Sequence, residues 1–230
     1  MRLVNLIKIK LNIFNMKKII ITQETYPDDP RSWDNMTKII CFHNRYNLGD
    51  TFNKYNSSAF DSWQELSEQL HKDYNIAAIL PIYMLDHSGI TISTGSFDCK
   101  WDSGQIGFIF ITKETIIENF GGKNLTLKMQ QKAVEICESD IEIYNQYLNN
   151  DVYRFRIIDE VEYLKVPLAN FDDKGIMILD PSNYETIIED NEIASCGGFY
   201  GDNWFENGMS DHIPEELHEL LKTTEITYEN

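Results

Sequence analysis

The sequence has few of the features that define several large protein classes. It contains only four cysteines, Cys41, Cys99, Cys137 and Cys196, which lie 58, 38 and 59 residues apart without a CxxC pair. Disulfide scaffolds of secreted proteins show denser spacing, so we expect reduced thiols in a cytoplasm. No segment reaches about 18 uninterrupted apolar residues, the length that a membrane-spanning helix needs.

The N-terminal segment is apolar and basic, but it lacks the pattern of a signal peptide. Lys8 and Lys10 interrupt its apolar run, and no small-residue cleavage site follows. We therefore expect residues 1–15 to be an extension and Met16 to open the first strand. An amphipathic membrane anchor is the alternative for this segment.

Motifs for catalysis and for metal or phosphate binding are also missing. There is no GxSxG and no HExxH, and neither Gly121-Gly122 nor Gly197-Gly198 precedes a lysine and a helix start in the register of a phosphate loop. Glu215, His218 and Glu219 can share a helix face and bind a divalent ion weakly, but a solvated acidic helix is the simpler interpretation. We expect no metal and no cofactor.

Basic residues are scarce in the last part of the chain. Residues 1–20 carry no acids and 5 bases, residues 21–133 carry 14 acids and 10 bases, and residues 134–230 carry 23 acids and 5 bases. The last 97 residues therefore hold a net charge of −18, against −17 for the whole chain. Such a surface repels nucleic acid and membranes and attracts basic proteins.

Apolar periodicity predicts an alternation of strands and helices. Trp63, Leu66 and Leu70 recur at three- and four-residue steps, a pattern typical of an amphipathic helix. We expect strands over 17–22, 37–43, 76–85, 90–94, 104–112, 152–158, 161–168 and 176–179, a strand or loop over 192–200, and helices over 57–74, 113–120, 125–148, 181–188 and 214–222.

The order of these elements predicts an α+β fold: an antiparallel β-sheet with a long helix packed on one face and an acidic C-terminal region. The three strands between 76 and 112 follow one another closely, which favours an antiparallel meander. We expect an N-terminal extension over 1–15, an α+β core over 16–158, an acidic insertion over 159–190, and a C-terminal strand and acidic helix over 191–230.

One polar cluster supplies the residue types of a nucleophilic active site. An enzyme, such as a small hydrolase or a nucleotide-modifying protein, would take Cys99 or Ser103 as nucleophile and His87 as base. Asp86 or Asp102 would orient the histidine.

Turn formation explains the same cluster more simply. Asp, Ser and Gly favour tight turns, so the segments DHSG and WDSG are expected to form the two corners of the meander. Trp101 would then fill the core beside one corner. A partner-contacting loop is the third interpretation.

Carboxylates in the last part of the chain are interleaved with aromatic residues. Together they can present the charge and the flat surface that a nucleic-acid-binding groove accepts, although a solvated surface explains them as well. On the long helix we expect Met129, Ala133, Ile136, Ile143, Tyr144 and Tyr147 on the buried side, with acidic residues facing water. The expected partner-binding residues are Glu135, Glu138, Asp140, Glu142, Asp159, Glu160, Glu162, Asp172, Asp173, Glu189, Asp190 and Glu192.

Three blocks of the sequence carry a family resemblance. They are LPIYMLDHSGITISTGSFDCKWDSGQIGFIFITKE at 80–114, IEIYNQYLNNDVYRFRI at 141–157 and ASCGGFYG at 194–201. They resemble a group of proteins encoded by bacteriophages and mobile elements, with blocks of the form LPLYLYDHSG, CPWDSGQVGFIYVSKE, EYDQYLTGDVYGF and DSCWGFYG. Here Lys100 replaces a proline, Gly197 replaces a tryptophan, and about 30 extra residues, 159–190, separate the last two blocks, which in the group are nearly adjacent hairpin strands.

The resemblance implies a phage or mobile-element product in a bacterial cytoplasm. Acidic proteins in that setting resemble DNA decoys that oppose restriction enzymes or CRISPR effectors. The leading hypothesis is therefore a non-enzymatic anti-CRISPR or antirestriction protein. It would mimic DNA and bind a basic nucleic-acid-binding protein of the host, with no direct contact to nucleic acid or membrane. The enzyme described above and a generic intracellular interaction domain are the alternatives.

Overall fold

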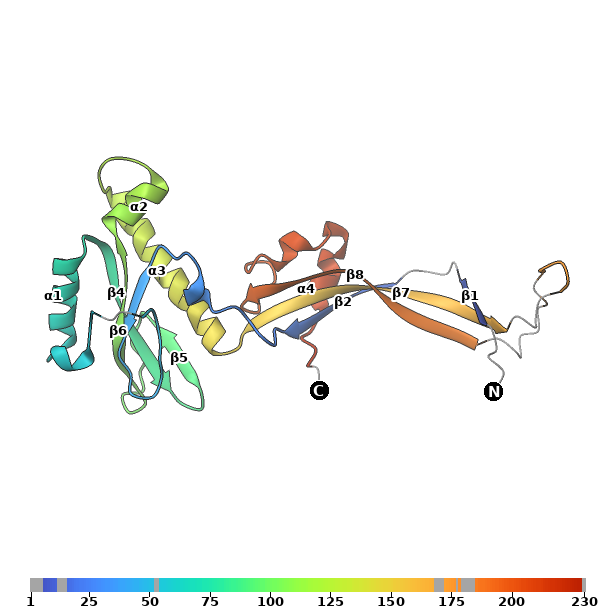
Figure 1. The fold of residues 1–230 in the computed structure, drawn as a ribbon, viewed down its shortest axis with the longest axis horizontal. Helices are drawn as coiled ribbons and strands as arrows, with labels where there is room; N and C mark the ends of the chain where they lie inside the picture. The colour runs from blue at the N-terminus through green and yellow to red at the C-terminus, as the bar shows by residue number, and fades with distance from the viewer. Residues whose placement is uncertain are drawn as a thin grey trace. The chain divides into compact units, whose positions relative to one another are not determined.

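The computed structural model describes residues 6–11, 16–51, 54–167, 172–176, 178 and 185–228 (Figure 1). The chain forms two compact units, which we describe one at a time. Unit 1 combines Met1–Glu24 with Tyr153–Asn230, and unit 2 is Thr25–Val152. These boundaries differ from the expected single core over 16–158, because the first strands of the chain join its last third.

Unit 2 is built on a four-stranded antiparallel sheet with the order β3-β6-β4-β5. The expected meander is wrong, because β6 pairs with β4 and not with β5. A tight turn at 87–89 joins β4 to β5, and residues 94–102 then return the chain to the other edge of β4, where Leu85 lies opposite Ser103. The strands are β3 (Lys38–Cys41), β4 (Ile76–Asp86), β5 (Ile90–Ser93) and β6 (Ser103–Thr112).

Both faces of this sheet are buried. Successive side chains of a strand point to opposite faces, and both sets are apolar in the central strand β6. On β6, Ile109 and Ile111 pack with residues of the longest helix, whereas Phe108 and Phe110 pack with Leu66 on the opposite face. The fold is therefore α+β with the long helix packed on one face of an antiparallel sheet, as expected. The helical elements of unit 2 are η1 (Pro30–Ser32), η2 (Ser57–Ala59), α1 (Trp63–Asp73), α2 (Lys113–Phe120) and α3 (Leu127–Leu148).

Helix α3 places three of its carboxylates, Glu135, Glu138 and Glu142, opposite its buried side. Its fully buried residues are spaced by four, four and three, so they lie on one face. Ala133 and Tyr144 were expected there, whereas Cys137 and Ile141 were not. The Thr126 hydroxyl caps the helix by accepting a hydrogen bond from Met129 N at 3.2 Å.

Unit 1 contains a second sheet, in which one long strand pairs with three others (Figure 1). Leu6 lies opposite Pro167, and Met16 lies opposite Glu160, so β1 and β2 both run antiparallel to β7. Residues 6–10 therefore belong to the sheet, and the expectation that they form a mere extension is wrong. The strands are β1 (Leu6–Lys10), β2 (Met16–Gln23), β7 (Val152–Pro167) and β8 (Glu185–Tyr200).

The described parts of the expected insertion mostly lengthen this sheet. Residues 159–167 continue β7 and residues 185–190 begin β8, so each strand reaches 16 residues. The helix expected over 181–188 is wrong for 185–188, and 181–184 lie outside the described residues. Residues 172–175 form a turn, because Gly175 N donates to Asp172 O at 2.9 Å.

The core of unit 1 lies where short helical elements cover the paired strands. Tyr153, Phe155 and Ile157 alternate along β7 and contact Ile21 and Leu221 in one apolar cluster. The helix expected over 214–222 is present as a short helix followed by α4. The helical elements of unit 1 are η5 (Met209–His212), η6 (Glu215–Leu217) and α4 (His218–Thr223).

Candidate functional site

The fold brings together much of the polar cluster that the sequence analysis singled out. Asp86 ends β4 and its backbone N–H donates to Asp102 O at 2.8 Å, which joins the two turn segments. His87 Nδ1 lies 3.4 Å from Asp102 Oδ2, and Cys99 Sγ lies 3.7 Å from the same oxygen. Ser103 donates its hydroxyl to the Cys99 carbonyl.

The order of these groups does not match a nucleophile activated by histidine. Asp102 lies between His87 and Cys99, whereas a triad needs the histidine between the nucleophile and the acid. The His87 side chain is 71% exposed and that of Asp102 is 44% exposed, so neither is withdrawn from water. The cluster therefore has the residue types of an active site but not its arrangement.

Turn formation accounts for most of the cluster. His87 N donates to Gly89 O at 3.1 Å, and Ser88 adopts a left-handed φ of 58° in this turn. The expectation that Trp101 fills the core is wrong, because its side chain is 97% exposed. An aromatic ring this exposed contributes little to folding and is available for contact with another molecule.

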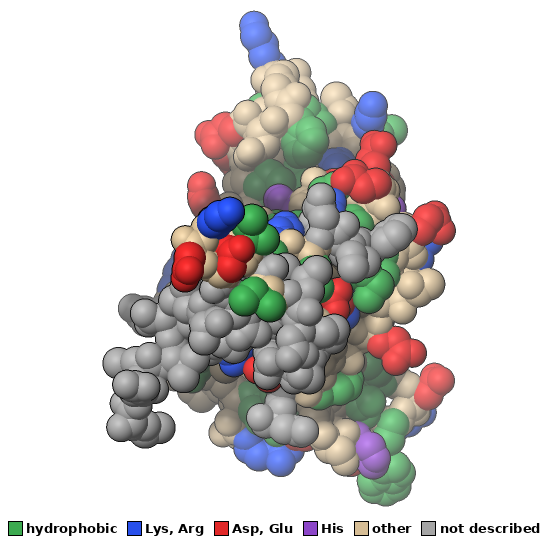
Figure 2. Space-filling model, turned by 90° about the vertical axis from the view of Figure 1, so that its right-hand side faces the viewer, with side chains coloured by type: hydrophobic (Ala, Val, Ile, Leu, Met, Phe, Trp, Pro, Cys, Tyr) green, Lys and Arg blue, Asp and Glu red, His purple; other side chains and the backbone are tan. Residues whose placement is uncertain are grey.

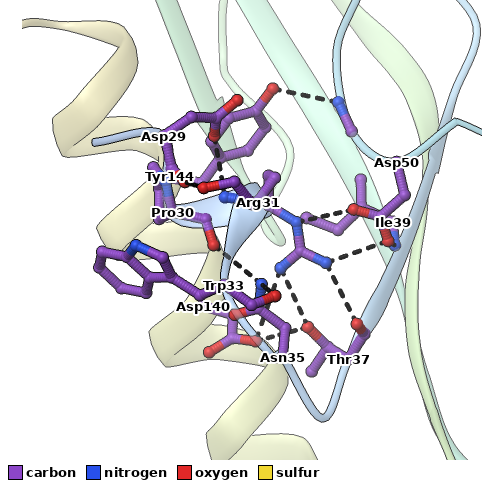
Figure 3. Close-up of polar contacts among 12 residues, drawn as sticks. Asp29, Pro30, Arg31, Trp33, Asn35, Thr37, Ile39, Asp50, Asp140 and Tyr144 are labelled. Carbon is purple, nitrogen blue, oxygen red and sulfur yellow. Dashed lines mark hydrogen bonds and ion pairs between the residues drawn. The ribbon is translucent and has the colours of Figure 1, made fainter. Parts of the chain in front are cut away.

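A second polar group, missed in the sequence analysis, lies inside unit 2 (Figure 3). The Arg31 side chain is only 5% exposed, and its guanidinium donates to both carboxylate oxygens of Asp50 at 3.0 Å. It also donates to the Thr37 carbonyl at 3.1 Å and lies 3.8 Å from an Asp140 oxygen. We call Arg31, Thr37, Asp50 and Asp140 the buried network.

The buried network connects elements that lie far apart in sequence. Asp50 Oδ2 accepts from Ile39 N at 2.8 Å, and the Asp140 carboxylate accepts from the Thr37 hydroxyl. Burial raises the pKa of Asp140 above its usual value, although Thr37 and Arg31 oppose the shift. The arginine makes a bidentate contact with Asp50 and also approaches Asp140. The network therefore connects η1, β3 and α3, which indicates a structural role in stabilising unit 2.

A hollow of about 480 Å³ opens in the surface of unit 2 between the end of β3 and the start of α1. Its wall includes the aromatic rings of Phe42, Tyr46, Phe60 and Trp63, and it also includes Asp61. Cys41 reaches the same hollow, and burial raises the pKa of its thiol to about 12, so it remains protonated. Aromatic residues at a strand end and at a helix start were the only sequence signal for this site.

The expected partner-binding residues in unit 2 lie in two environments. Glu135, Glu138 and Glu142 are exposed on α3, and we call them the α3 acidic row. Only Glu135 of the row has an ion pair among the described residues, with Lys132 at 3.2 Å on the same helix. Asp140 instead belongs to the buried network, so its carboxylate already has protein partners.

Two of the expected partner-binding residues in unit 1, Glu160 and Glu189, pair with lysines from the start of the chain. Because β1 and β2 pair with β7, lysines of the N-terminal segment lie beside the acidic strands. The ion pairs are Lys8–Glu189, Lys18–Glu160 and, at 3.6 Å, Lys17–Glu216. Partner-binding candidates on this sheet and its turn are half-buried at Asp159, Glu160, Glu162 and Glu189, and exposed at Asp172, Asp173, Asp190 and Glu192.

The excess charge is therefore less one-sided in three dimensions than along the chain. Unit 1 carries 19 acids and 10 bases, and unit 2 carries 18 acids and 10 bases. Figure 2 shows acidic and basic side chains interspersed on the face that it draws. The basic first segment offsets part of the acidic last segment, and both units are similarly negative.

The described residues contain no group of three or more His, Cys, Asp or Glu side chains that could hold a metal ion. Nε2 of His218 lies 3.1 Å from Ser210 O and 3.0 Å from Ile213 O, so this ring bonds to backbone carbonyls. All four cysteines are free thiols. No helix in the described ranges is long and apolar enough to cross a membrane.

Comparison of the chain with protein families, curated proteins and solved structures finds no match.

Proposed function

We propose that this protein is a non-enzymatic inhibitor that binds a basic nucleic-acid-binding protein. In view of the phage-like sequence blocks, the partner is a host defence nuclease, either a CRISPR effector or a restriction enzyme, in a bacterial cytoplasm. The inhibitor occupies the surface that normally holds DNA or RNA. A net charge of −17, with an acidic excess on both units, supports attraction to such a partner.

The observation that carries the proposal is the α3 acidic row. Glu135, Glu138 and Glu142 follow one another at three- and four-residue steps, so they form a line along one side of the helix. The line spans about 10 Å of helix axis. The three carboxylates are thus about 5 Å apart along the helix axis. One strand of DNA carries a phosphate about every 3.4 Å of its axis, so the row has about two-thirds of the charge density of a DNA strand.

The row is also well placed for contact with a basic groove. The buried side of α3 packs against the sheet, so the opposite side and its carboxylates face solvent. The pair between Glu135 and Lys132 has both side chains about half exposed, so it costs little to exchange for a partner's lysine or arginine. Two of the three carboxylates have no such pair to break among the described residues.

Affinity capture tests this proposal directly. The full chain, used as bait in a bacterial lysate at low salt, is expected to retain a nucleic-acid-binding protein and to release it as salt rises, because salt screens exposed charges. A variant with Glu135, Glu138 and Glu142 replaced by lysine is expected to lose the partner.

A matched control separates the row from net charge. Replacement of Glu68, Asp98 and Glu118 by lysine makes the same charge change at exposed positions of unit 2 outside α3. Capture is expected to persist in this variant, perturbed only through the overall field. Equal loss in both variants would show that the row has no special role, and retention in both would refute the proposal.

The enzyme alternative is favoured by one observation, the meeting of His87, Cys99 and Asp102. It requires the histidine to turn from Asp102 toward the thiol, since a base must reach its nucleophile. If the protein is such an enzyme, H87A and C99A abolish its effect on a partner while the α3 acidic row is dispensable. The inhibitor proposal expects the reverse.

A further inference from the structure

The hollow beside α1 has aromatic walls that are held in place from within unit 2. Phe42 and Trp63 stack with ring centroids 6.3 Å apart and an interplanar angle of 16°. The edge-to-face contact of Trp63 with Phe108, at 6.2 Å and 78°, ties this wall to the apolar cluster under α1. The rings are therefore pre-organised rather than free to collapse into the hollow.

Asp61 gives the hollow a negative charge. Among the described residues that line the hollow, it is the only one with a formal charge at pH 7 when His43 is neutral. Glu65, near Asp61, takes part in capping the N-terminus of α1. The Glu65 carboxylate accepts a hydrogen bond from Asp61 N at 2.8 Å, and the backbone N–H of Glu65 donates to Ser62 Oγ at 3.2 Å. No basic side chain among the described residues lies within ion-pair distance of the Asp61 carboxylate.

Two basic residues that precede Asp61 in the chain, Arg45 and Lys54, already have other partners. Arg45 pairs with Asp86 and lies over the Tyr46 ring at 5.6 Å. Lys54 pairs with Asp73 at 2.9 Å, on the far end of α1 from Asp61. The chain therefore places its own cations on aromatic rings and carboxylates nearby, yet leaves Asp61 to solvent.

We propose that this hollow binds the guanidinium group of an arginine side chain presented by the basic partner. The inference rests on the proposed function for the source of the arginine. Guanidinium is planar and weakly hydrated, so it stacks on aromatic faces such as those of Phe42 and Trp63. Its forked donors match the Asp61 carboxylate, and the amide oxygens of Asn44 and Asn47 on the same wall accept further N–H groups.

The size and charge of the hollow favour this ligand over others. A volume of about 480 Å³ holds an arginine side chain with water around it. The Asp61 charge disfavours phosphate and carboxylate ligands. A lysine ammonium fits less well, because it is strongly hydrated and cannot stack as a plane.

The test is an NMR titration of the full chain, labelled with ¹⁵N, with three short peptides. They are acetyl-Gly-Arg-Gly-amide, the same peptide with lysine, and the same peptide with citrulline, which keeps the shape of arginine without its charge. The arginine peptide is expected to shift the indole N–H signal of Trp63, with affinity about fivefold or more above that for citrulline. The lysine peptide is expected to bind more weakly than the arginine peptide.

Two variants assign the effect to the hollow. D61N removes the charge at nearly constant volume, and a loss in affinity for the arginine peptide of about fivefold is expected. E68Q removes an exposed charge on α1 outside the hollow, and no loss is expected. The ¹⁵N spectrum of each variant verifies its fold.

The outcomes separate this inference from the proposed function. Equal affinity for arginine and citrulline peptides, or an unchanged affinity in D61N, overturns the guanidinium site whatever the lysate shows. If D61N loses the peptide but still captures the partner as wild type does, the hollow is not part of the partner interface and the inference is wrong, whereas the proposed function stands. If the peptide binds but no nucleic-acid-binding protein is captured, the proposed function fails and so does the arginine source named here.

Discussion

Replacement of Arg31 by methionine is expected to destabilise unit 2 strongly. Arg31 is 5% exposed, and the side chains of Asp50 and Asp140 are only 23% and 21% exposed. The variant keeps most of the volume of the arginine but leaves two carboxylates without their shared cation. Breaking a buried pair on one side typically costs 3–5 kcal/mol. Because both acids retain some contact with water, we expect about 3 kcal/mol, at the low end of that range.

Urea denaturation measures this loss. With a slope of about 2 kcal/mol per molar, a 3 kcal/mol loss lowers the midpoint by about 1.5 M. Tryptophan fluorescence suits the assay, because Trp33, Trp63 and Trp101 belong to unit 2 and only Trp204 belongs to unit 1. The ¹⁵N spectrum in the absence of urea shows whether the variant still folds.

The matched control is Arg45→Met. Arg45 also pairs with an aspartate, Asp86, but its side chain is 67% exposed. An exposed pair contributes about 1 kcal/mol or less, so the midpoint is expected to fall by at most about 0.5 M. If both variants lower the midpoint equally, burial of the network is not the source of its stabilisation and the reasoning is refuted.

Three further predictions follow from local geometry. Because burial raises the pKa of Asp140, its carboxyl binds a proton more tightly in the folded state than in the unfolded chain. Ionisation of this carboxyl therefore lowers the stability of the folded state as pH rises above 3.8, the usual pKa of aspartate. Urea midpoints measured across pH should therefore move in favour of D140N relative to wild type as pH increases, and a constant difference would contradict the burial argument. G107A places a Cβ 1.9 Å from Ile40 O and is expected to cost about 3 kcal/mol or more by urea titration, whereas G104A, with no atom within 4 Å of its Cβ, should cost about 0.5 kcal/mol or less. W101A should change the free energy of unfolding by no more than about 0.5 kcal/mol, because the Trp101 ring is exposed. A larger loss would show that this ring packs against the protein in solution.

Local patterns predicted the elements of unit 2 well. The helix expected over 125–148 is α3 at Leu127–Leu148, and the strand expected over 104–112 is β6 at Ser103–Thr112. Periodicity, a capping threonine and terminal asparagines act within a few residues, so they are visible in the sequence. The order of the strands is not, because the path of residues 94–102 around β4 depends on pairing between distant segments.

The same limit explains the errors in unit 1. Leu6–Lys10 has the composition of a strand, but the pairing partner that makes it one lies in β7, more than 150 residues away. β7 was expected as two separate strands, over 152–158 and 161–168, because Asp159 and Glu160 hid the continuity between them. As a result, the charges of the N-terminal lysines and of the acidic segment were counted separately although they lie side by side.

The candidate sites show a similar division. Asp102 was one of the two carboxylates expected to orient His87, but its position between His87 and Cys99 was not expected. The contact of Arg31 with Asp50 and Asp140 had no sequence signal, because it depends on three elements meeting in the folded unit. The exposure of a side chain also depends on residues far away in sequence. Trp101 was expected in the core, but the structure shows that it is exposed to solvent.

The most direct test of the central claim is an inhibition titration with the nuclease that the bait captures. The protein is expected to block DNA cleavage at about one equivalent per nuclease, to lose potency as salt rises, and to lose it when Glu135, Glu138 and Glu142 become lysine while H87A and S103A remain fully active. Inhibition at far below one equivalent, insensitive to salt and to the α3 acidic row but abolished by H87A, would contradict the account and identify an enzyme.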